Sequence, residues 1–322
     1  MKILIVNNTK IPATEYGGTE RIIWWLGKEL HRRGHNISYL VAKGSSCPFA
    51  HILEYNPQQP LHGQIPDDVD LVHLHFQVVE KIKKPYLITH HANYHFQKEF
   101  DINTVFVSRN HAERHCSTAY VLNGLDPEEY GPVSFDKTRK YLLFLAYAKR
   151  PEKNLKDCLY IARKTKHQLA VVGGKHRWFK WRPWVEYKGF IGGEKKNDVL
   201  RNSQALLFPV RWHEPCAVTI FEGLYFGCPV FATPYGCLPE LIDAKLGFLS
   251  NSRSELIKAV GRMDQFNHQA IHQFTCAYLS AKRMTNNYLR LYEKVLNGET
   301  INQTPPLNRG NFSRDHLLPM YD

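Results

Sequence analysis

Two acids, Glu214 and Glu222, stand eight positions apart in the segment 208–240. Pro215 follows the first acid and predicts the start of a helix, because proline fits the first turn of a helix and disrupts its interior. At 3.6 residues per turn, acids eight apart lie about two turns apart on similar faces. One acid can then lie at the mouth of the helix and the other deeper in the same cleft.

The expected helix start is a candidate anion site. First-turn N–H groups and the positive end of the helix dipole suit a phosphate or diphosphate. Gly227 and Pro229 end the helix, and residues 228–233 are typical of a buried strand. The alternative is that both acids are solvated charges on a helix surface, which is the common case for a random pair at this spacing.

Residues 140–146 are strongly apolar and predict a strand, which a basic loop with Lys149, Arg150 and Lys153 connects to a helix. A strand, a basic loop and a helix in this order suit a bound phosphate. The alternative is a solvated basic turn.

Residues 2–7 predict a buried parallel strand, and a polar loop then ends in Gly17 and Gly18 before a helix over about 20–33. This order is typical of the start of a doubly wound α/β domain. A pair of glycines is also common in ordinary turns.

His90 and His91 end a strand predicted over 85–91, at the edge where open α/β sheets bind ligands. A metal site is the alternative. No acid or cysteine lies at a matching ligand spacing, and adjacent residues on a strand point to opposite faces. We therefore expect no metal ligands here.

The chain carries a net charge of +12, which favours an anionic partner such as a nucleotide sugar, an anionic lipid surface or a nucleic acid. Residues 136–201 contain 18 Lys and Arg against six Asp and Glu, so the excess is local. Within it, residues 175–184 interleave four aromatic residues with four cations. This stretch would suit single-stranded nucleic acid, a membrane interface or, as the favoured interpretation, packed rings with solvated cations.

A length of 322 residues suits two domains of about 150 residues each. No run of eighteen apolar residues occurs, and the N-terminus does not have the pattern of a signal peptide. We expect a cytoplasmic protein. The seven cysteines show no C-x-x-C pair, which predicts reduced thiols.

The segment 208–240 resembles the E-x7-E signature of retaining glycosyltransferases with the GT-B fold, in particular those of family 4. The matching residues are Glu214, Pro215, Glu222, Gly227, Pro229, Val230, Gly236 and Glu240. The segment departs from the pattern at Cys216, Ala217 and Gly223.

Four further motifs of this family are matched in order along 1–297. They are G-G-T-E-R at 17–21, T-x-H-G at 89–92 with Ala92 for Gly, V-x-N-G-[IV]-D at 121–126 with Leu125, and the end of a G-R-x-x-x-x-K-[GN] motif at Lys153 and Asn154. The arginine of the last motif has no direct counterpart, so Lys149 or Arg150 would supply the second cation.

The resemblance implies an α/β fold with two doubly wound Rossmann-like domains facing a cleft. Residues 1–138 would form the acceptor-side domain and 139–270 the nucleotide-sugar-binding domain. Residues 271–297 would belong to a long C-terminal helix, predicted over 268–297, that crosses back to the first domain. Residues 298–322 would form an irregular tail.

The resemblance also implies transfer of a sugar from a nucleotide-sugar donor, with retention, to a glycan, lipid-linked or small-molecule acceptor. No metal and no other cofactor would be needed. Glu214 would orient the sugar hydroxyls, His91 would face the sugar, Lys153 would meet the diphosphate charge and Glu222 would bind the ribose. The other donor-binding candidates are Gly17, Gly18, Arg150, Val218 and Thr219.

Two other classes remain open. One is a different GT-B enzyme, such as a sugar-nucleotide epimerase or a phosphorylase-like transferase. The other is a non-catalytic protein that binds a nucleotide sugar or a polyanion. Nucleic acid is the partner we expect least, and the basic charge favours peripheral contact with an anionic inner membrane face.

Overall fold

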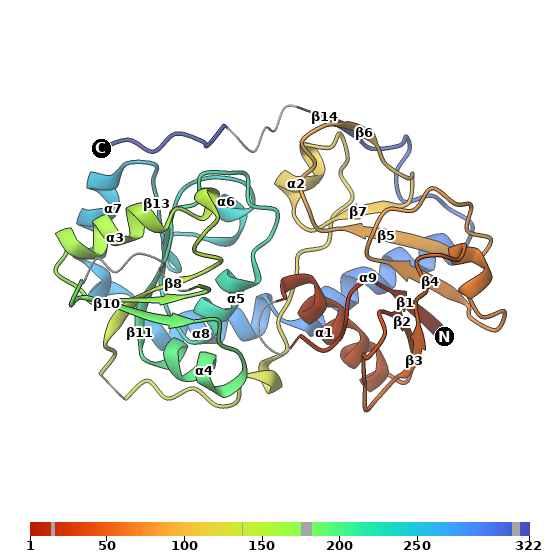
Figure 1. Ribbon diagram of the computed structural model, residues 1–322, viewed down its shortest axis with the longest axis horizontal. Coiled ribbons are helices and arrows are strands. Elements are labelled where there is room, and N and C mark those ends of the chain that lie inside the picture. The colour runs from red at the N-terminus through yellow and green to blue at the C-terminus, as the bar shows by residue number, and fades with distance from the viewer. Residues whose placement is uncertain (14–16, 137, 175–181, 311–315) are drawn as a thin grey trace. The chain divides into compact units, whose positions relative to one another are not determined.

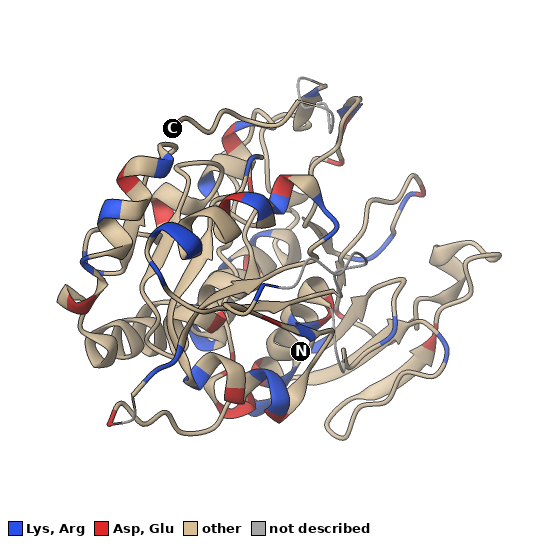
Figure 2. Ribbon diagram, turned by 60° about the vertical axis from the view of Figure 1, so that its left-hand side comes forward, with Lys and Arg blue, Asp and Glu red and all other residues tan. Residues whose placement is uncertain are grey.

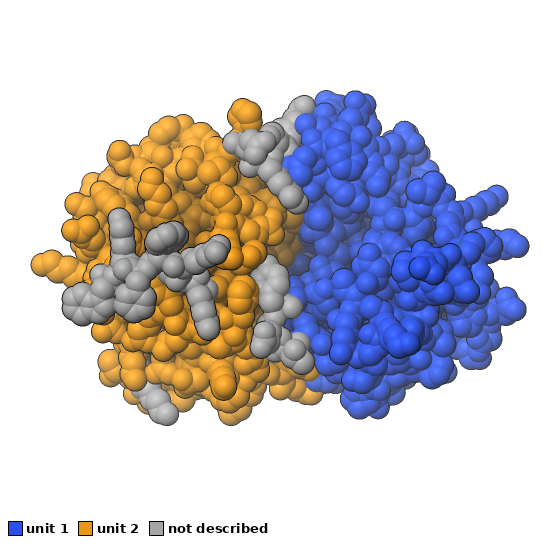
Figure 3. Space-filling model, viewed as in Figure 1, with its two compact units in different colours: residues 1–13, 17–125, 280–313 blue, residues 14–16, 126–279, 314–322 orange. Residues whose placement is uncertain are grey.

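The computed structural model describes residues 1–13, 17–136, 138–174, 182–310 and 316–322. They form two compact units (Figure 3), which we call unit 1 and unit 2. Unit 1 contains the described residues of 1–125 and 280–310, and unit 2 those of 126–279 and 316–322. The division lies between Leu125 and Asp126, earlier than the boundary at 138 that the sequence suggested.

Unit 1 is built on a six-stranded sheet with the strand order β3-β2-β1-β4-β5-β7 (Figure 1). Its strands are β1 (Lys2–Val6), β2 (Asn36–Val41), β3 (His51–Glu54), β4 (Leu71–Leu74), β5 (Tyr86–His90) and β7 (Thr104–Phe106). All neighbouring strands run parallel. This is the strand order of a Rossmann fold, as predicted. The short edge strand β3 was not predicted.

Helices and a small two-stranded ladder complete unit 1. They are α1 (Gly18–Arg32), η1 (Leu61–Gln64), α2 (Arg109–Glu113) and α9 (Ala281–Leu296), with β6 (Gln97–Glu99) paired to β14 (Leu307–Arg309). The start of α1 directly after Gly17 confirms the predicted order of strand, glycine loop and helix.

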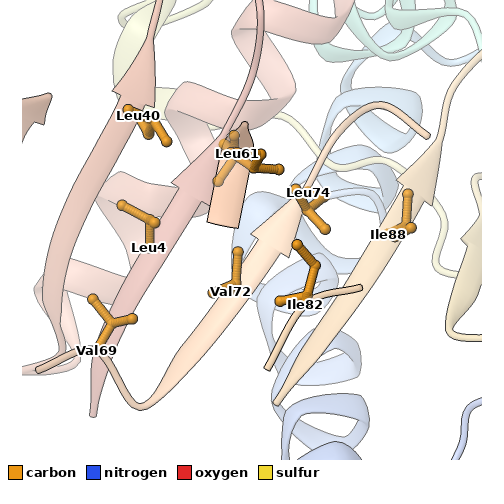
Figure 4. Packing of buried hydrophobic residues seen from close by; sticks show 9 residues of the cluster. Leu4, Leu40, Leu61, Val69, Val72, Leu74, Ile82 and Ile88 are labelled. Atoms are coloured by element: carbon orange, nitrogen blue, oxygen red, sulfur yellow. The ribbon is translucent and has the colours of Figure 1, made fainter. Parts of the chain in front are cut away.

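Successive side chains of a strand point to opposite faces of the sheet. The two faces of the unit 1 sheet therefore carry different residues and make different contacts. One face carries a buried aliphatic cluster that includes Leu4, Val72 and Ile88 (Figure 4). On the other face, β4 and β5 meet α9 through hydrogen bonds between side chains. His73 Nδ1 lies 2.8 Å from the Tyr292 hydroxyl. The last helix of the unit is therefore fixed to its central strands.

Unit 2 repeats the same plan, with the strand order β10-β9-β8-β11-β12-β13 and parallel neighbours. Its strands are β8 (Tyr141–Leu145), β9 (Leu169–Val172), β10 (Val185–Gly189), β11 (Ser203–Phe208), β12 (Val230–Ala232) and β13 (Gly247–Leu249). Its helices are η2 (Pro127–Glu129), η3 (Pro151–Lys153), α3 (Leu155–Lys164), α4 (Gly193–Arg201), α5 (Val218–Tyr225), α6 (Leu238–Leu241), α7 (Arg253–Val260), η4 (Met263–Gln265) and α8 (His268–Tyr278). The prediction of two doubly wound units is confirmed.

The prediction of one long helix over 268–297 is wrong. The chain forms α8 in unit 2 and α9 in unit 1, separated by Leu279 and Ser280. Ser280 has an extended backbone, and the N–H of Ala281 donates to the carbonyl of Leu125 at 2.7 Å. This long-range backbone contact interrupts the helix where the sequence has neither glycine nor proline.

The prediction of an irregular tail is partly wrong. β14 pairs antiparallel with β6, and the buried Asn308 side chain donates to the carbonyls of Tyr94 and Phe96 at 3.0 and 2.7 Å. A strand held by backbone pairing and one asparagine needs no hydrophobic pattern, so no sequence pattern indicated it. Most of the basic aromatic stretch 175–184, namely 175–181, lies outside the described residues.

All seven cysteines are free thiols, four of them buried, in agreement with the prediction of reduced thiols. Burial raises the pKa of the Cys228 thiol to about 11, which keeps this thiol protonated and unreactive at neutral pH. Within the described ranges, no helix has the length and apolar character required to cross a membrane.

The Gly27→Ala substitution should destabilise the chain, although alanine is the better helix former. A Cβ atom at Gly27 would lie 1.9 Å from the hydroxyl oxygen of the buried Tyr39. We expect a loss of about 1–3 kcal/mol of unfolding free energy, the usual range for overpacking, measured by urea denaturation. Gly63→Ala is the control, because no atom lies within 4 Å of its added Cβ. Equal stability of both variants would contradict this packing.

Candidate active site

The two central strands of unit 2, β8 and β11, lie side by side where the strand order reverses. Ligands of open α/β sheets bind beyond the carboxyl ends of the strands at this point. Lys153 lies in the loop after β8, and Glu214 in the loop after β11. The buried Asn154 side chain donates to the Pro209 carbonyl at 2.8 Å and so ties the two loops together.

Lys153 and Glu214 form a buried ion pair. Lys153 Nζ lies 2.6 Å from Glu214 Oε2, and the two side chains are only 9% and 6% exposed. The indole N–H of Trp212 donates to the same carboxylate oxygen at 2.7 Å. Burial removes both charges from water. The lost hydration is compensated only when the pairing geometry is excellent, or it is tolerated because the site has a function that requires the charges.

A second cation lies at the same indole ring. The Lys153 ammonium is 4.7 Å from the centroid of the Trp212 ring, and the Arg150 guanidinium is 5.3 Å from it. Arg150 also donates through Nε to Glu152 at 2.6 Å. The basic loop after β8 therefore brings two of the predicted cations, Lys153 and Arg150, to one aromatic side chain, although the arginine of the family motif has no direct counterpart.

Glu222 is buried in α5 and has its own cation. Lys196 of α4 forms an ion pair with Glu222 Oε1, and both side chains are almost fully buried. The Tyr130 hydroxyl donates to the same oxygen at 2.7 Å. Unit 2 thus contains two buried acids that each accept from a lysine. Figure 2 marks the Lys and Arg residues of the chain in blue and the Asp and Glu residues in red.

The prediction that the helix begins close to Pro215 is wrong, because α5 begins at Val218 after the extended residue Ala217. The Glu214 carbonyl accepts from the N–H of Cys237 at 2.9 Å. A Cβ at Gly236 would lie 2.2 Å from Glu214 backbone atoms. These contacts hold residue 214 in a loop, so only Glu222 lies on the helix and the two acids do not share a helical face.

The start of α5 retains the features of an anion site. No described side chain caps it, and Val218 and Thr219 are half-buried. The Thr219 hydroxyl donates to the Leu145 carbonyl at 3.0 Å, which fixes α5 to the end of β8. Any contact of these two residues with an anion would therefore come from their first-turn N–H groups.

His91, in unit 1, follows the end of β5 and is half-buried. Its Nε2 lies 2.9 Å from Nδ1 of His75, which follows β4. Desolvation lowers the pKa of His91 to about 4, so the ring is neutral at pH 7. A neutral imidazole here can hydrogen-bond a hydroxyl group but contributes no charge.

Gly17 and Gly18, also in unit 1, lie at the start of α1. A Cβ at Gly17 would lie 2.7 Å from the Ala13 Cβ and 2.8 Å from a Glu20 carboxylate oxygen. The backbone at Gly17 is therefore closely approached by its neighbours, whereas Gly18 is exposed.

Sequence reasoning missed Lys196, Tyr130 and Trp212. Lys196 did carry a signal, since it precedes Val199 and Leu200 by three and four positions and so lies on the apolar face of α4. Tyr130 carried no such signal, because it lies just after η2 in a stretch without apolar periodicity.

Comparison with known proteins gives a family match for part of the chain and a fold for nearly all of it. Residues 139–265 match the family model described as glycosyl transferases group 1. No curated protein sequence matches the chain.

Solved structures share the fold over nearly the whole chain. AviGT4, a glycosyltransferase involved in avilamycin A biosynthesis, is 21% identical with a TM-score of 0.79 and covers 93% of this chain and 99% of its own. The catalytic domain of starch synthase IV from Arabidopsis thaliana, bound to ADP and acarbose, is 12% identical with a TM-score of 0.71. The match covers 92% of this chain and 99% of that domain. HepE from Anabaena, in complex with UDP-glucose, is 12% identical with a TM-score of 0.64. The match covers 91% of this chain and 99% of HepE.

The chain therefore has the GT-B fold of two Rossmann-like units. Over residues 139–265 it matches the family model of group 1 glycosyl transferases, as the sequence resemblance predicted.

The Lys196→Met substitution should destabilise the chain by about 3–5 kcal/mol, because it leaves the buried Glu222 carboxylate without its cation. Adding Glu222→Gln should recover most of this loss, since the double variant buries no charge at this place. Urea unfolding of the four proteins in the cycle measures the coupling. Lys195→Met is the matched control, because Lys195 is exposed one position away. Additive losses in the double variant would contradict the buried pair.

Proposed function

We propose that the chain is a retaining glycosyltransferase that moves a sugar from a nucleotide-sugar donor to a glycan, lipid-linked or small-molecule acceptor. The observation that carries the proposal is the arrangement of Lys153, Glu214 and Glu222 around the loop after β11 and the start of α5. The group 1 match to residues 139–265 supports the reaction class. The structural neighbours HepE, in complex with UDP-glucose, and starch synthase IV, bound to ADP, support a nucleoside-diphosphate donor.

In this proposal Lys153 stabilises the negative charge that grows on the leaving diphosphate. An ammonium group has three N–H donors, so Lys153 can keep its bond to Glu214 while donating to a phosphate oxygen. The first-turn N–H groups of Val218 and Thr219 add partial positive charge without reorganisation. Arg150, which also lies over the Trp212 ring, is the second cation.

Glu222 binds the ribose in this proposal. Lys196 and Tyr130 both donate to Oε1, which holds the carboxylate in one orientation. A carboxylate held in this way accepts hydrogen bonds from vicinal hydroxyl groups without an entropic cost at binding. Glu214, held by Lys153 and Trp212, orients the hydroxyls of the sugar.

The transfer step then needs no protein base and no metal. The bond from the anomeric carbon to the phosphate oxygen breaks, and the acceptor oxygen forms the new bond on the same face. The acceptor proton passes to the leaving phosphate, which gains the negative charge. The neutral His91 hydrogen-bonds the sugar. The net charge of +12 supports a cytoplasmic enzyme that assembles polysaccharide or lipid-linked glycan at an anionic membrane face.

Lys153→Met should lower kcat/KM for sugar transfer by roughly 10²–10³-fold, the usual effect of losing one stabilising donor to a developing anion. The readout is release of nucleoside diphosphate under initial-rate conditions with acceptor present. Lys156→Met is the control, because Lys156 is exposed on α3 nearby. An unchanged rate in Lys153→Met, with a normal unfolding curve, would remove Lys153 from the mechanism.

The reaction class is tested with a panel of nucleotide sugars, each incubated with and without candidate glycan and lipid-linked acceptors. We expect nucleotide release that depends on the acceptor, persists in chelator and gives a product whose anomeric configuration, determined by NMR, equals that of the donor. Dependence on inorganic phosphate would favour a phosphorylase-like enzyme, and interconversion of the donor alone an epimerase. Donor binding without turnover across the panel would favour a non-catalytic binder.

A further inference from the structure

Three histidines of unit 1 lie together but have no role in the proposed transfer. His90 is the last residue of β5, and His111 lies in α2. His115 lies four residues after His111, just beyond the end of α2. All three are buried, with exposed fractions of 5%, 1% and 0%. Their candidate ligand nitrogens lie within 4.8 Å of one another. His91 lies outside this group, because adjacent residues of a strand point to opposite faces of the sheet.

His111 and His115 each have one ring nitrogen bonded to a backbone carbonyl. His111 Nε2 lies 3.1 Å from the Ala92 oxygen, and His115 Nδ1 lies 2.6 Å from the His111 oxygen. A carbonyl oxygen can only accept, so these ring nitrogens carry the protons, and the other nitrogen of each neutral ring carries a lone pair. In the same cluster, Nε2 of His90 is left without a partner among the described residues.

These remaining nitrogens are His90 Nε2, His111 Nδ1 and His115 Nε2. Each is buried and has no hydrogen-bond partner among the described residues. Three buried acceptors without a donor in one cluster are unfavourable. A cation that takes all three lone pairs removes this penalty, and an N–H bonded to a carbonyl is the usual way in which proteins orient a metal-binding histidine.

The surroundings complete a closed site. Phe106 stacks on His115 with ring centroids 4.7 Å apart, and Phe100 packs edge-on against the same ring at 5.3 Å. The N–H of Leu307, at the start of β14, donates to the His115 carbonyl at 2.8 Å. Imidazole ligands favour zinc and its neighbours in the first transition row, whereas magnesium and calcium require oxygen ligands.

We propose that His90, His111 and His115 form a three-histidine site for a divalent transition metal of the zinc type, with water as fourth ligand. Bonds of about 2.0–2.1 Å would place the nitrogens roughly 3.3 Å apart, so the rings need only small rotations. The site joins α2 to β5 and plays no part in sugar transfer.

The test is the metal content of the tag-free full chain after chelator treatment, reloading with Zn²⁺ or Co²⁺ and desalting. We expect one metal ion per chain, visible d–d absorption of tetrahedral Co²⁺, and an unfolding midpoint that rises with Zn²⁺ concentration. A wild-type chain that retains no metal and shows no such absorption overturns the proposal.

Variants locate the ion. His111→Asn should lose the metal and the Co²⁺ spectrum, and His90→Gln and His115→Gln give independent measurements if one variant does not fold. His51→Asn, an exposed histidine, and His75→Asn, on the other face of the sheet, should retain both. Loss of metal in His75→Asn with retention in His111→Asn would overturn the assignment.

Discussion

The buried charge pairs of unit 2 are the constraint on which its candidate site depends. A lysine and a glutamate removed from water are tolerated only when each neutralises the other at hydrogen-bond distance. Lys153 and Glu214 meet this condition across two loops that follow neighbouring central strands. Lys196 and Glu222 meet it between α4 and α5. The loops and helices of the site are therefore held by the same charges that are proposed to act on the donor.

The two units use histidine and lysine differently. In unit 2 the buried lysines Lys153 and Lys196 are paired with acids, so positive charge lies at the site in a form that the proposed diphosphate can share. In unit 1 the buried histidines are neutral, because desolvation lowers the pKa of His73, His91 and their neighbours. Unit 1 therefore offers hydrogen bonds and lone pairs rather than charge. This difference agrees with a donor anion bound by unit 2.

The sequence predicted both sheets because each central strand is a short aliphatic run between turn signals, and it predicted the acids because their spacing matches a known signature. It failed where long-range contacts decide the outcome. Ser280 interrupts a helix through the backbone of Leu125, and Glu214 is held in a loop by Gly236 and Cys237. The histidine trio was missed because acids and cysteines were sought as partners of His90, whereas the partners are histidines four positions apart on a later segment.

The separation of α8 from α9 affects the order in which the two units can fold during translation. Unit 1 includes α9, whose Tyr288 and Tyr292 hydroxyls bond to Thr89 and His73 inside the sheet. During synthesis these tyrosines leave the ribosome only after residues 126–279 are complete. The strands that carry His73 and Thr89 are translated first and thus lack their contact with this helix until the end of synthesis. The later unit can fold before the earlier one is finished, which reverses the usual N-to-C order of domain folding.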